Sequence, residues 1–292
     1  YSLSSPILGA DKESPMDLDS FKYQRNSRPI DDFLGLSSTE MHHILYNPLS
    51  ENSPVRLRRH APNEVLDAIP ALRIFESLVE LILQEPKGIK LTTAEFLPRR
   101  VVHEIYAKGY LLEPDIEVGI SKLDREQKWP TLYSIRMAMV VGELLEVENG
   151  RLRVTSNYFE LKSNRTLLFK KLLETYANDF NWGFMDGYPD EDPVGQVAWG
   201  FTLYMLNKWG LEERDALVYA HQYHKAFPFM IGPFEGFGDQ AFDAFERCYV
   251  LRALIGFAAR FGLAEVDFDY FELKSDVRAT ALLGKVFEID ED

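Results

Sequence analysis

The sequence predicts a mainly α-helical protein with small β-hairpins, an α+β fold with two tandem winged-helix-like modules and an N-terminal tail. Two observations predict it: helical stretches with one apolar face, and two places where such a stretch precedes a hairpin pattern. A chain of 292 residues is long enough for about two domains. We expect a tail, short helix and connector in residues 1–63, the first module in 64–178, and the second, more helical module in 179–292.

The N-terminal segment is predicted to hold one short helix. Residues 1–28 are rich in Ser, Pro, Asp and Lys without apolar periodicity, which is typical of a tail. Ser37 or Ser38 can cap the helix, and Glu40 follows Ser37 by three residues, as in a capping box. We expect the helix to end near Tyr46, before Pro48, and residues 47–63 to be a connector.

The first module is predicted from the order helix, strand, helix, helix, hairpin, which is the order of a winged helix. Helices are expected from Leu72 to before Pro86, over residues 101–109, and from Pro130 to about Gly142, with a short strand at 89–91. Asn149-Gly150 joins two apolar strands and is the strongest short hairpin signal. A further helix over about 166–177 leaves the module.

The second half resembles the first. Helices are expected at 194–208, 212–226 and 240–261. In both halves the last helix precedes an apolar–Glu–Val strand, a connection, and a strand ending in Arg-x-Thr: residues 144–147 with 152–155, and 263–266 with 277–280. This pattern predicts an ancient tandem duplication with a longer second hairpin. The hexamer shared by residues 158–163 and 270–275 falls at different places in the two halves, so we interpret it as chance.

Composition limits the classes of function. A net charge of −14 disfavours non-specific binding to DNA or anionic lipid, although residues 87–171 carry an excess of basic side chains. The single cysteine, Cys248, excludes an internal disulfide framework and a multi-cysteine zinc site, and favours a reducing compartment. No apolar stretch approaches the roughly 20 residues of a membrane span. We therefore predict a cytoplasmic protein that does not bind membranes.

The composition of the third helix of the first module indicates whether the module contacts DNA or protein. In a DNA-reading module, this helix presents polar and basic side chains to the major groove. Here residues 131–143 contain one cation, Arg136, and apolar residues at every helical phase. A helix that is apolar all round is buried on more than one side. We therefore expect it to pack against protein, which disfavours base readout.

A basic surface remains as an alternative nucleic-acid site. Arg99, Arg100, Arg151 and Arg153 are expected on the second helix and the hairpin of the first module. Such a group can hold a few phosphates. The competing interpretation is a solvated face with surface ion pairs.

His221 and His224 lie three residues apart on a predicted helix and are candidate metal ligands. A metal site needs a third ligand from elsewhere, and the sequence has no HExxH motif. Tyr219 and Tyr223 flank the pair, as on an ordinary aromatic face. The acidic loop 179–192 lacks the EF-hand spacing and is expected to be a solvated turn with aromatic anchors. No catalytic residue and no cofactor are predicted.

Three stretches, residues 30–48, 90–99 and 247–252, resemble a family of uncharacterised bacterial proteins. The middle stretch with its hairpin is also similar to the region that trails the plasmid ORF-3-like domain. The resemblance implies no activity, cofactor or catalytic residue.

The leading hypothesis is a non-catalytic protein-interaction or regulatory protein, with a protein partner or self-association. A DNA-associated regulator that binds phosphates through the four arginines is the alternative, and a metal-dependent enzyme around His221 and His224 is the third.

Overall fold

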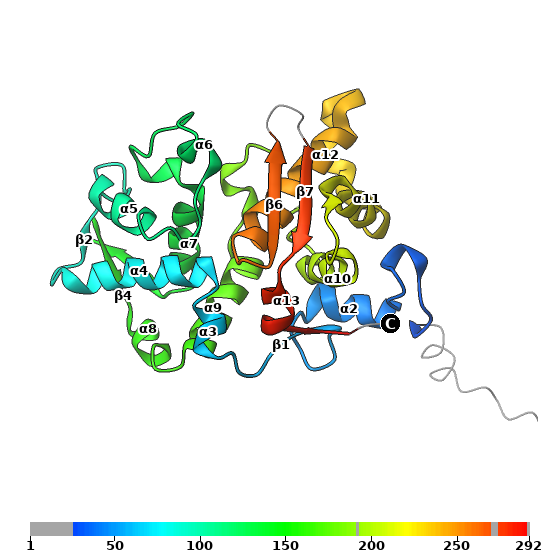
Figure 1. Ribbon diagram of the computed structural model, residues 1–292, viewed down its shortest axis with the longest axis horizontal. Helices are drawn as coiled ribbons and strands as arrows, with labels where there is room; N and C mark the ends of the chain where they lie inside the picture. The colour runs from blue at the N-terminus through cyan, green and yellow to red at the C-terminus, as the bar shows by residue number, and fades with distance from the viewer. Residues whose placement is uncertain (1–25, 191–192, 270–273, 291–292) are drawn as a thin grey trace, which may run out of the picture.

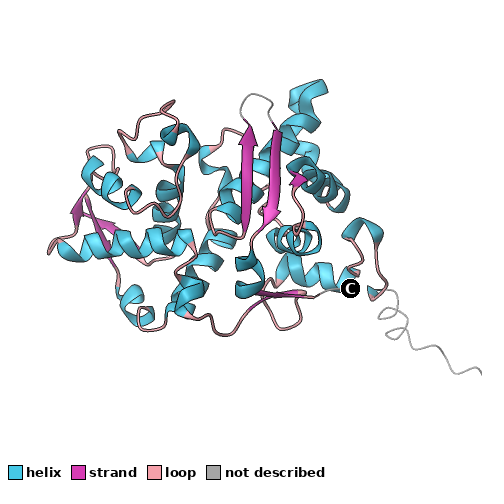
Figure 2. Ribbon diagram, viewed as in Figure 1, coloured by secondary structure: helices cyan, strands magenta, loops and turns pink. Residues whose placement is uncertain are grey.

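The computed structural model describes residues 26–190, 193–269 and 274–290. Residues 1–25 of the predicted tail and most of the second copy of the hexamer lie outside them. Within these residues the chain is mainly helical, with three small antiparallel sheets (Figure 2). The predicted α+β class is therefore confirmed. No helix in the described part of the chain combines the length and apolar character needed to cross a membrane.

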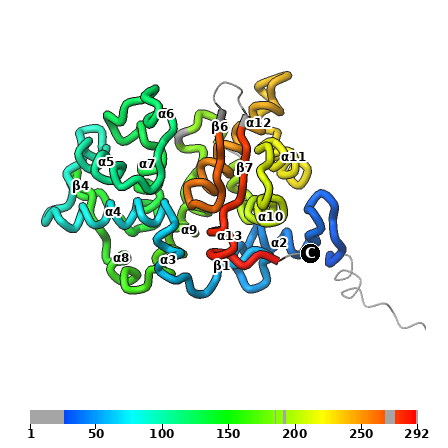
Figure 3. The backbone as a smooth tube through the Cα atoms, in the orientation of Figure 1, coloured from blue at the N-terminus to red at the C-terminus, as the bar shows by residue number. Residues whose placement is uncertain are grey.

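The N-terminal segment begins with η1 (Asp31–Phe33) and α2 (Ser38–Tyr46). The predicted capping box is present: the Ser37 backbone N–H donates to Glu40 Oε2 at 2.7 Å, and the Glu40 N–H donates to Ser37 Oγ at 3.3 Å. The predicted connector contains a strand, β1 (Val55–Leu57), which pairs with β8 (Phe287–Ile289) near the other end of the chain. Figure 3 shows the blue and red segments side by side there.

The first sheet and its helices occupy residues 63–179, on the left of Figure 1. The elements are α3 (Asn63–Leu66), α4 (Pro70–Gln84), β2 (Ile89–Lys90), α5 (Arg99–Tyr106), α6 (Pro114–Glu117), η2 (Glu126–Lys128), α7 (Pro130–Val141), β3 (Leu145–Glu148), β4 (Arg151–Val154), α8 (Ser156–Leu161), α9 (Arg165–Glu174) and the π-helical η3 (Thr175–Asp179). The strand order is β2-β4-β3. Asn149 and Gly150 both have positive φ, 52° and 69°, as the predicted two-residue turn requires.

The second sheet and its helices follow, on the right of Figure 1. The elements are η4 (Trp182–Met185), α10 (Trp199–Trp209), β5 (Arg214–Asp215), α11 (Ala216–Ala226), η5 (Pro228–Gln240), α12 (Ala241–Tyr249), the π-helical η6 (Val250–Ala259), β6 (Ala264–Asp269), β7 (Lys274–Ala279) and α13 (Ala281–Val286). The strand order is β5-β7-β6.

Two helices of this half begin later than predicted. The helix expected from residue 194 begins at Trp199, because Gly195 and Ala198 have positive φ. The helix expected from residue 212 begins at Ala216, because residues 214–215 pair with β7 as β5. Asp215 then caps the helix, since its Oδ1 accepts from the Leu217 N–H at 2.9 Å.

An equivalent hydrogen bond closes each of the two hairpins. Thr155, after β4, donates its hydroxyl to the Glu143 carbonyl at 2.6 Å, and Thr280, after β7, donates to the Gly262 carbonyl at 2.6 Å. Both acceptor residues have positive φ. The Glu and Arg of the sequence pattern face each other across both hairpins, with Glu146 opposite Arg153 and Glu265 opposite Arg278. The repeated sequence pattern therefore occupies equivalent positions in the two hairpins.

Candidate functional site

Most of helix α7 is buried, as its sequence predicts. The Arg136 side chain is 3% exposed and Glu126 is 0% exposed. Arg136 Nε and Nη2 donate to the two carboxylate oxygens of Glu126 at 2.6 and 3.1 Å, and the Leu97 N–H also donates to that carboxylate, at 2.8 Å. The only cation of α7 therefore has its partner inside the protein.

The C-terminal end of α7 packs closely against η3. A Cβ added to Gly142 would lie 2.7 Å from Thr175 Oγ1 and 2.9 Å from its Cγ2. Only glycine fits this contact without a shift of Thr175. Segment η3 therefore covers one side of α7 near its C-terminal end.

The third helix of the second half, α12 continued by η6, is held by another buried ion pair. Arg252 Nε and Nη2 donate to Asp186 at 2.5 and 3.1 Å, and Nη2 also donates to the Pro189 carbonyl at 3.0 Å. Both side chains are nearly closed to solvent. The acidic loop 179–192 was predicted to be a solvated turn, and at Asp186 this prediction is wrong, because Arg252 draws that carboxylate into the interior.

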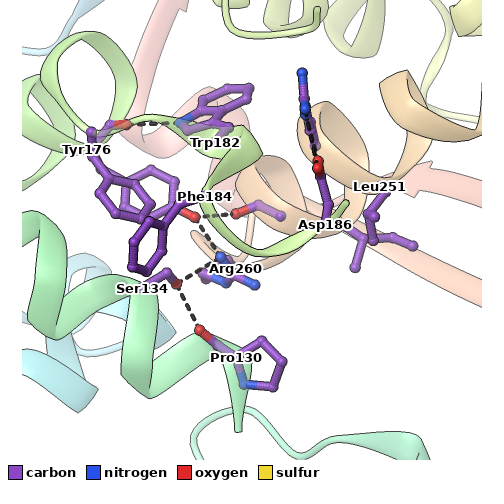
Figure 4. A pocket seen from close by; sticks show the side chains of 12 residues that line it. Pro130, Ser134, Tyr176, Trp182, Phe184, Asp186, Leu251 and Arg260 are labelled. Carbon is purple, nitrogen blue, oxygen red and sulfur yellow. Dashed lines mark hydrogen bonds and ion pairs between the residues drawn. The ribbon is translucent and has the colours of Figure 1, made fainter. Parts of the chain in front are cut away.

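A cavity of about 160 Å³ lies between α7 and η6, with η3, η4 and the following loop as its third wall (Figure 4). It is lined by Pro130, Ser134, Tyr176, Phe180, Trp182, Phe184, Asp186, Leu251, Arg252, Ile255, Gly256 and Arg260. Helices α7 and η6 thus meet around one cavity. In a DNA-reading module, the corresponding helix would instead be open to solvent.

Hydrogen bonds fix the polar side of this cavity. Arg260, directly after η6, donates Nη1 to Ser134 Oγ at 2.8 Å and to the Tyr176 hydroxyl. That hydroxyl donates to the Gly256 carbonyl at 2.8 Å. Trp182 Nε1 donates to the Tyr176 carbonyl at 2.8 Å. These bonds connect α7 and η6 to residues 176–182, the segment between the two halves.

The sequence did not predict this cavity. The one feature of the sequence that pointed to it is the pair Arg252 and Arg260 in an otherwise apolar helix. A buried arginine needs a partner with a negative charge or a ligand. The aromatic wall comes from residues 176–184, whose spacing matches no binding motif.

Three of the four candidate arginines gather around one turn, residues 85–88. Arg100 from α5 pairs with Glu85 at 3.3 Å, Arg151 Nη1 donates to the Gly88 carbonyl at 2.9 Å, and Arg153 Nε donates to the Lys87 carbonyl at 3.4 Å. Arg100 also contacts Glu104, and Arg153 contacts Glu148. The fourth, Arg99, donates instead to His103 on its own helix, at 3.1 Å.

His221 and His224 lie on α11, against the ring of Phe242. His221 stacks on that ring and its Nε2 contacts Glu246 Oε1, and His224 meets the ring edge-on. Burial, and then the neighbouring His221, lower the pKa of His224 from its ordinary value. Burial raises the pKa of Glu246.

Within residues 26–190, 193–269 and 274–290, no group of three or more His, Cys, Asp or Glu side chains is placed to hold a metal ion. The two histidines therefore have no complete ligand set in the described part of the chain. Comparisons with protein-family models, with curated proteins and with solved structures find no match to this chain.

Proposed function

We propose that this chain is a non-catalytic protein-interaction or regulatory protein built on two tandem winged-helix-like modules. The order helix, strand, helix, helix, hairpin occurs twice, in α4 to β4 and in α10 to β7. The two sheets have the corresponding strand orders, β2-β4-β3 and β5-β7-β6. The matched hydrogen bonds of Thr155 and Thr280 further support a duplicated module.

The observation that carries the functional part of the proposal is the burial of α7. A third helix that reads bases must offer its polar side chains to the major groove. Arg136 is engaged with Glu126 inside the protein, and η3 covers the end of the helix. A helix in this position can support the interface between the modules, but its one cation is not available for base readout.

Two insertions supply the expected contact surface. Each lies between the second and third helix of its half: residues 107–129 with α6, and η5. They expose large apolar side chains, with Ile120 74% and Phe229 66% exposed. Exposed acidic residues lie among them: Glu117, Glu235 and Asp239. Both insertions project along the upper edge of the molecule in Figure 1. Clustered exposed apolar residues commonly mark protein interfaces, and a partner with an apolar and basic surface would fit here.

The test compares the full chain with an insertion variant, Val118→Ser/Ile120→Ser/Phe229→Ser. The control, Val147→Ser/Leu167→Ser, removes exposed apolar residues elsewhere. Sedimentation measures self-association, and quantitative co-purification from the source cells measures partners. We expect wild type and control to retain a partner or a second copy that the insertion variant loses. A strict monomer with no partner that depends on the insertions would contradict the proposal.

The alternative function is a DNA-associated regulator that uses Arg99, Arg100, Arg151 and Arg153. The convergence of three of these arginines on the turn at residues 85–88 favours it. Glu85 and Glu148 partly neutralise the group. This alternative predicts duplex binding at low salt that Arg100→Ala/Arg153→Ala abolishes. Our leading proposal predicts that the variant and the wild type behave alike.

A further inference from the structure

We propose that the cavity between α7 and η6 binds a small aromatic monocarboxylate, about the size of benzoate, whose carboxylate pairs with Arg260. The proposed ligand site lies between α7 and η6 and opens to solvent beside Phe184 and Leu251, which are 45% and 37% exposed. It therefore does not rest on the protein-contact function proposed for the insertions.

The charge of the lining favours a monoanion. Among the twelve lining residues the charged side chains are Asp186, Arg252 and Arg260. Asp186 is paired through both oxygens with Arg252, so these two charges offset each other. Arg260 forms no ion pair within the described residues. The cavity therefore carries one uncompensated positive charge in surroundings that are mostly apolar, and such a charge is stabilised by a single counter-charge.

The geometry of Arg260 favours a carboxylate. Its Nη1 is occupied by Ser134 and Tyr176. Nε is buried and, like Nη2, has no hydrogen-bond partner in the described part of the chain. Because Nε is closed to solvent, Nη2 is the nitrogen left to donate to a carboxylate oxygen. The bonds to Ser134 and Tyr176 fix the orientation of the guanidinium.

The remaining walls favour an aromatic ring. Tyr176, Phe180, Trp182 and Phe184 bring four rings to the cavity from one short segment (Figure 4), and Leu251 and Ile255 add aliphatic surface from η6. Aromatic pairs gain energy from offset or edge-to-face contacts beyond simple burial. A volume of about 160 Å³ compares with the roughly 150 Å³ cavity that accommodates benzene in another protein. A single ring with one carboxylate matches both the volume and the charge.

Inorganic phosphate matches the site less well. It needs several hydrogen-bond donors and carries more than one negative charge near neutral pH. The cavity offers one guanidinium without an ion-pair partner among the described residues, that of Arg260, and mostly apolar surface. Phosphate is therefore the competing anion in the test, and benzamide is the neutral molecule of nearly the same shape as benzoate.

The experiment titrates the full chain with benzoate, benzamide and phosphate, using calorimetry together with tryptophan fluorescence. Trp182 lines the cavity and reports on its occupancy, so Trp182→Phe should remove the fluorescence change but keep the calorimetric binding. Arg260→Gln and Arg260→Lys test the guanidinium. Arg278→Gln, which alters an exposed arginine on β7, is the matched control.

We expect saturable benzoate binding, with benzamide and phosphate weaker by on the order of tenfold or more. Arg260→Gln and Arg260→Lys should weaken benzoate binding by a similar factor, and Arg278→Gln should leave it unchanged. Should Arg260→Gln fail to fold, the comparison of benzoate with benzamide on the wild type decides. Equal affinity for these two ligands, an unchanged affinity in a folded Arg260 variant, or no saturable benzoate binding would overturn the proposal.

Discussion

Arg136 and Glu126 form a bidentate ion pair in the interior, with Nε of Arg136 2.6 Å from Oε1 of Glu126. Arg136 lies on α7, and Glu126 lies on η2, directly before that helix. Separation of the pair is costly because either charge alone would remain buried. The pair therefore fixes the orientation of α7, and the only cation of this helix is engaged inside the protein.

We predict that Glu126→Gln lowers the free energy of unfolding by about 3–5 kcal/mol, because Arg136 keeps a buried charge without its counter-charge. Urea unfolding measures the loss. The double variant Glu126→Leu/Arg136→Met removes both charges and should recover most of the stability. Equal losses in the single and double variants would argue against the ion pair. Arg278→Gln, at an exposed pair with Glu265, is the control and should not shift the midpoint.

A second prediction concerns the contact between α7 and η3. Gly142→Ala should destabilise the protein by about 1–3 kcal/mol, because the new Cβ would meet Thr175 at less than van der Waals distance. Thr175→Ala in the same chain removes the nearest atoms and should restore part of the loss. Gly284→Ala on α13 is the control, since no atom lies within 4 Å of its added Cβ. Thermal unfolding distinguishes these variants, and equal effects at Gly142 and Gly284 would refute the contact.

The lowered pKa of His224 predicts a stability that depends on pH. The folded state binds this proton less readily than the unfolded state, whose pKa is near the ordinary value of 6.5. The unfolded state therefore gains relative stability as pH falls below about 6.5, and the folded protein becomes less stable. His224→Gln should flatten this part of the profile, measured by urea unfolding from pH 7.5 to 5. An unchanged slope would show that His224 does not contribute.

Cys248 should be inert in the folded protein. Its side chain is buried, and burial raises the pKa of its thiol to about 12, so the reactive thiolate is scarce at neutral pH. Alkylation followed by mass spectrometry should show slow modification in buffer and complete modification in urea. Rapid modification of the native protein would mean that α12 opens readily.

Closure of the chain by β1 and β8 gives a further prediction. Phe287→Ala removes a buried ring next to Leu57 in the pair and should cost about 3–5 kcal/mol in unfolding free energy. Limited proteolysis should then cut within residues 47–63 faster than in wild type. Unchanged stability and cleavage would show that this pairing does not hold the segment.

Local patterns predicted much of the fold. The capping box of Ser37 and Glu40, the Asn149-Gly150 turn and the repeated Glu–Arg strands act between residues close in sequence, so their chemistry is readable without tertiary context. The burial of most of α7 followed from its composition alone, because a helix that is apolar at nearly every phase packs against protein on more than one side.

Long-range pairings could not be predicted in this way. Strand β1 contains three residues among prolines and finds its partner, β8, at the other end of the chain. The cavity likewise depends on Ser134, Tyr176 and Arg260, which are brought together only when both halves pack on the intervening segment. The arginines in the apolar helix, Arg252 and Arg260, indicated that each needs a partner, but the sequence does not identify the partner.

Labelling of α7 with a bulky maleimide reagent measures whether this helix is buried or open to DNA. In a Cys248→Ala background, Ser134→Cys and Val141→Cys place a thiol on the same face of the helix, at positions that are 4% and 49% exposed. We predict rapid labelling of the Val141→Cys variant, and labelling of the Ser134→Cys variant only at the rate of local opening. Equally rapid labelling of both would contradict this prediction, because α7 would then be an open surface available to DNA.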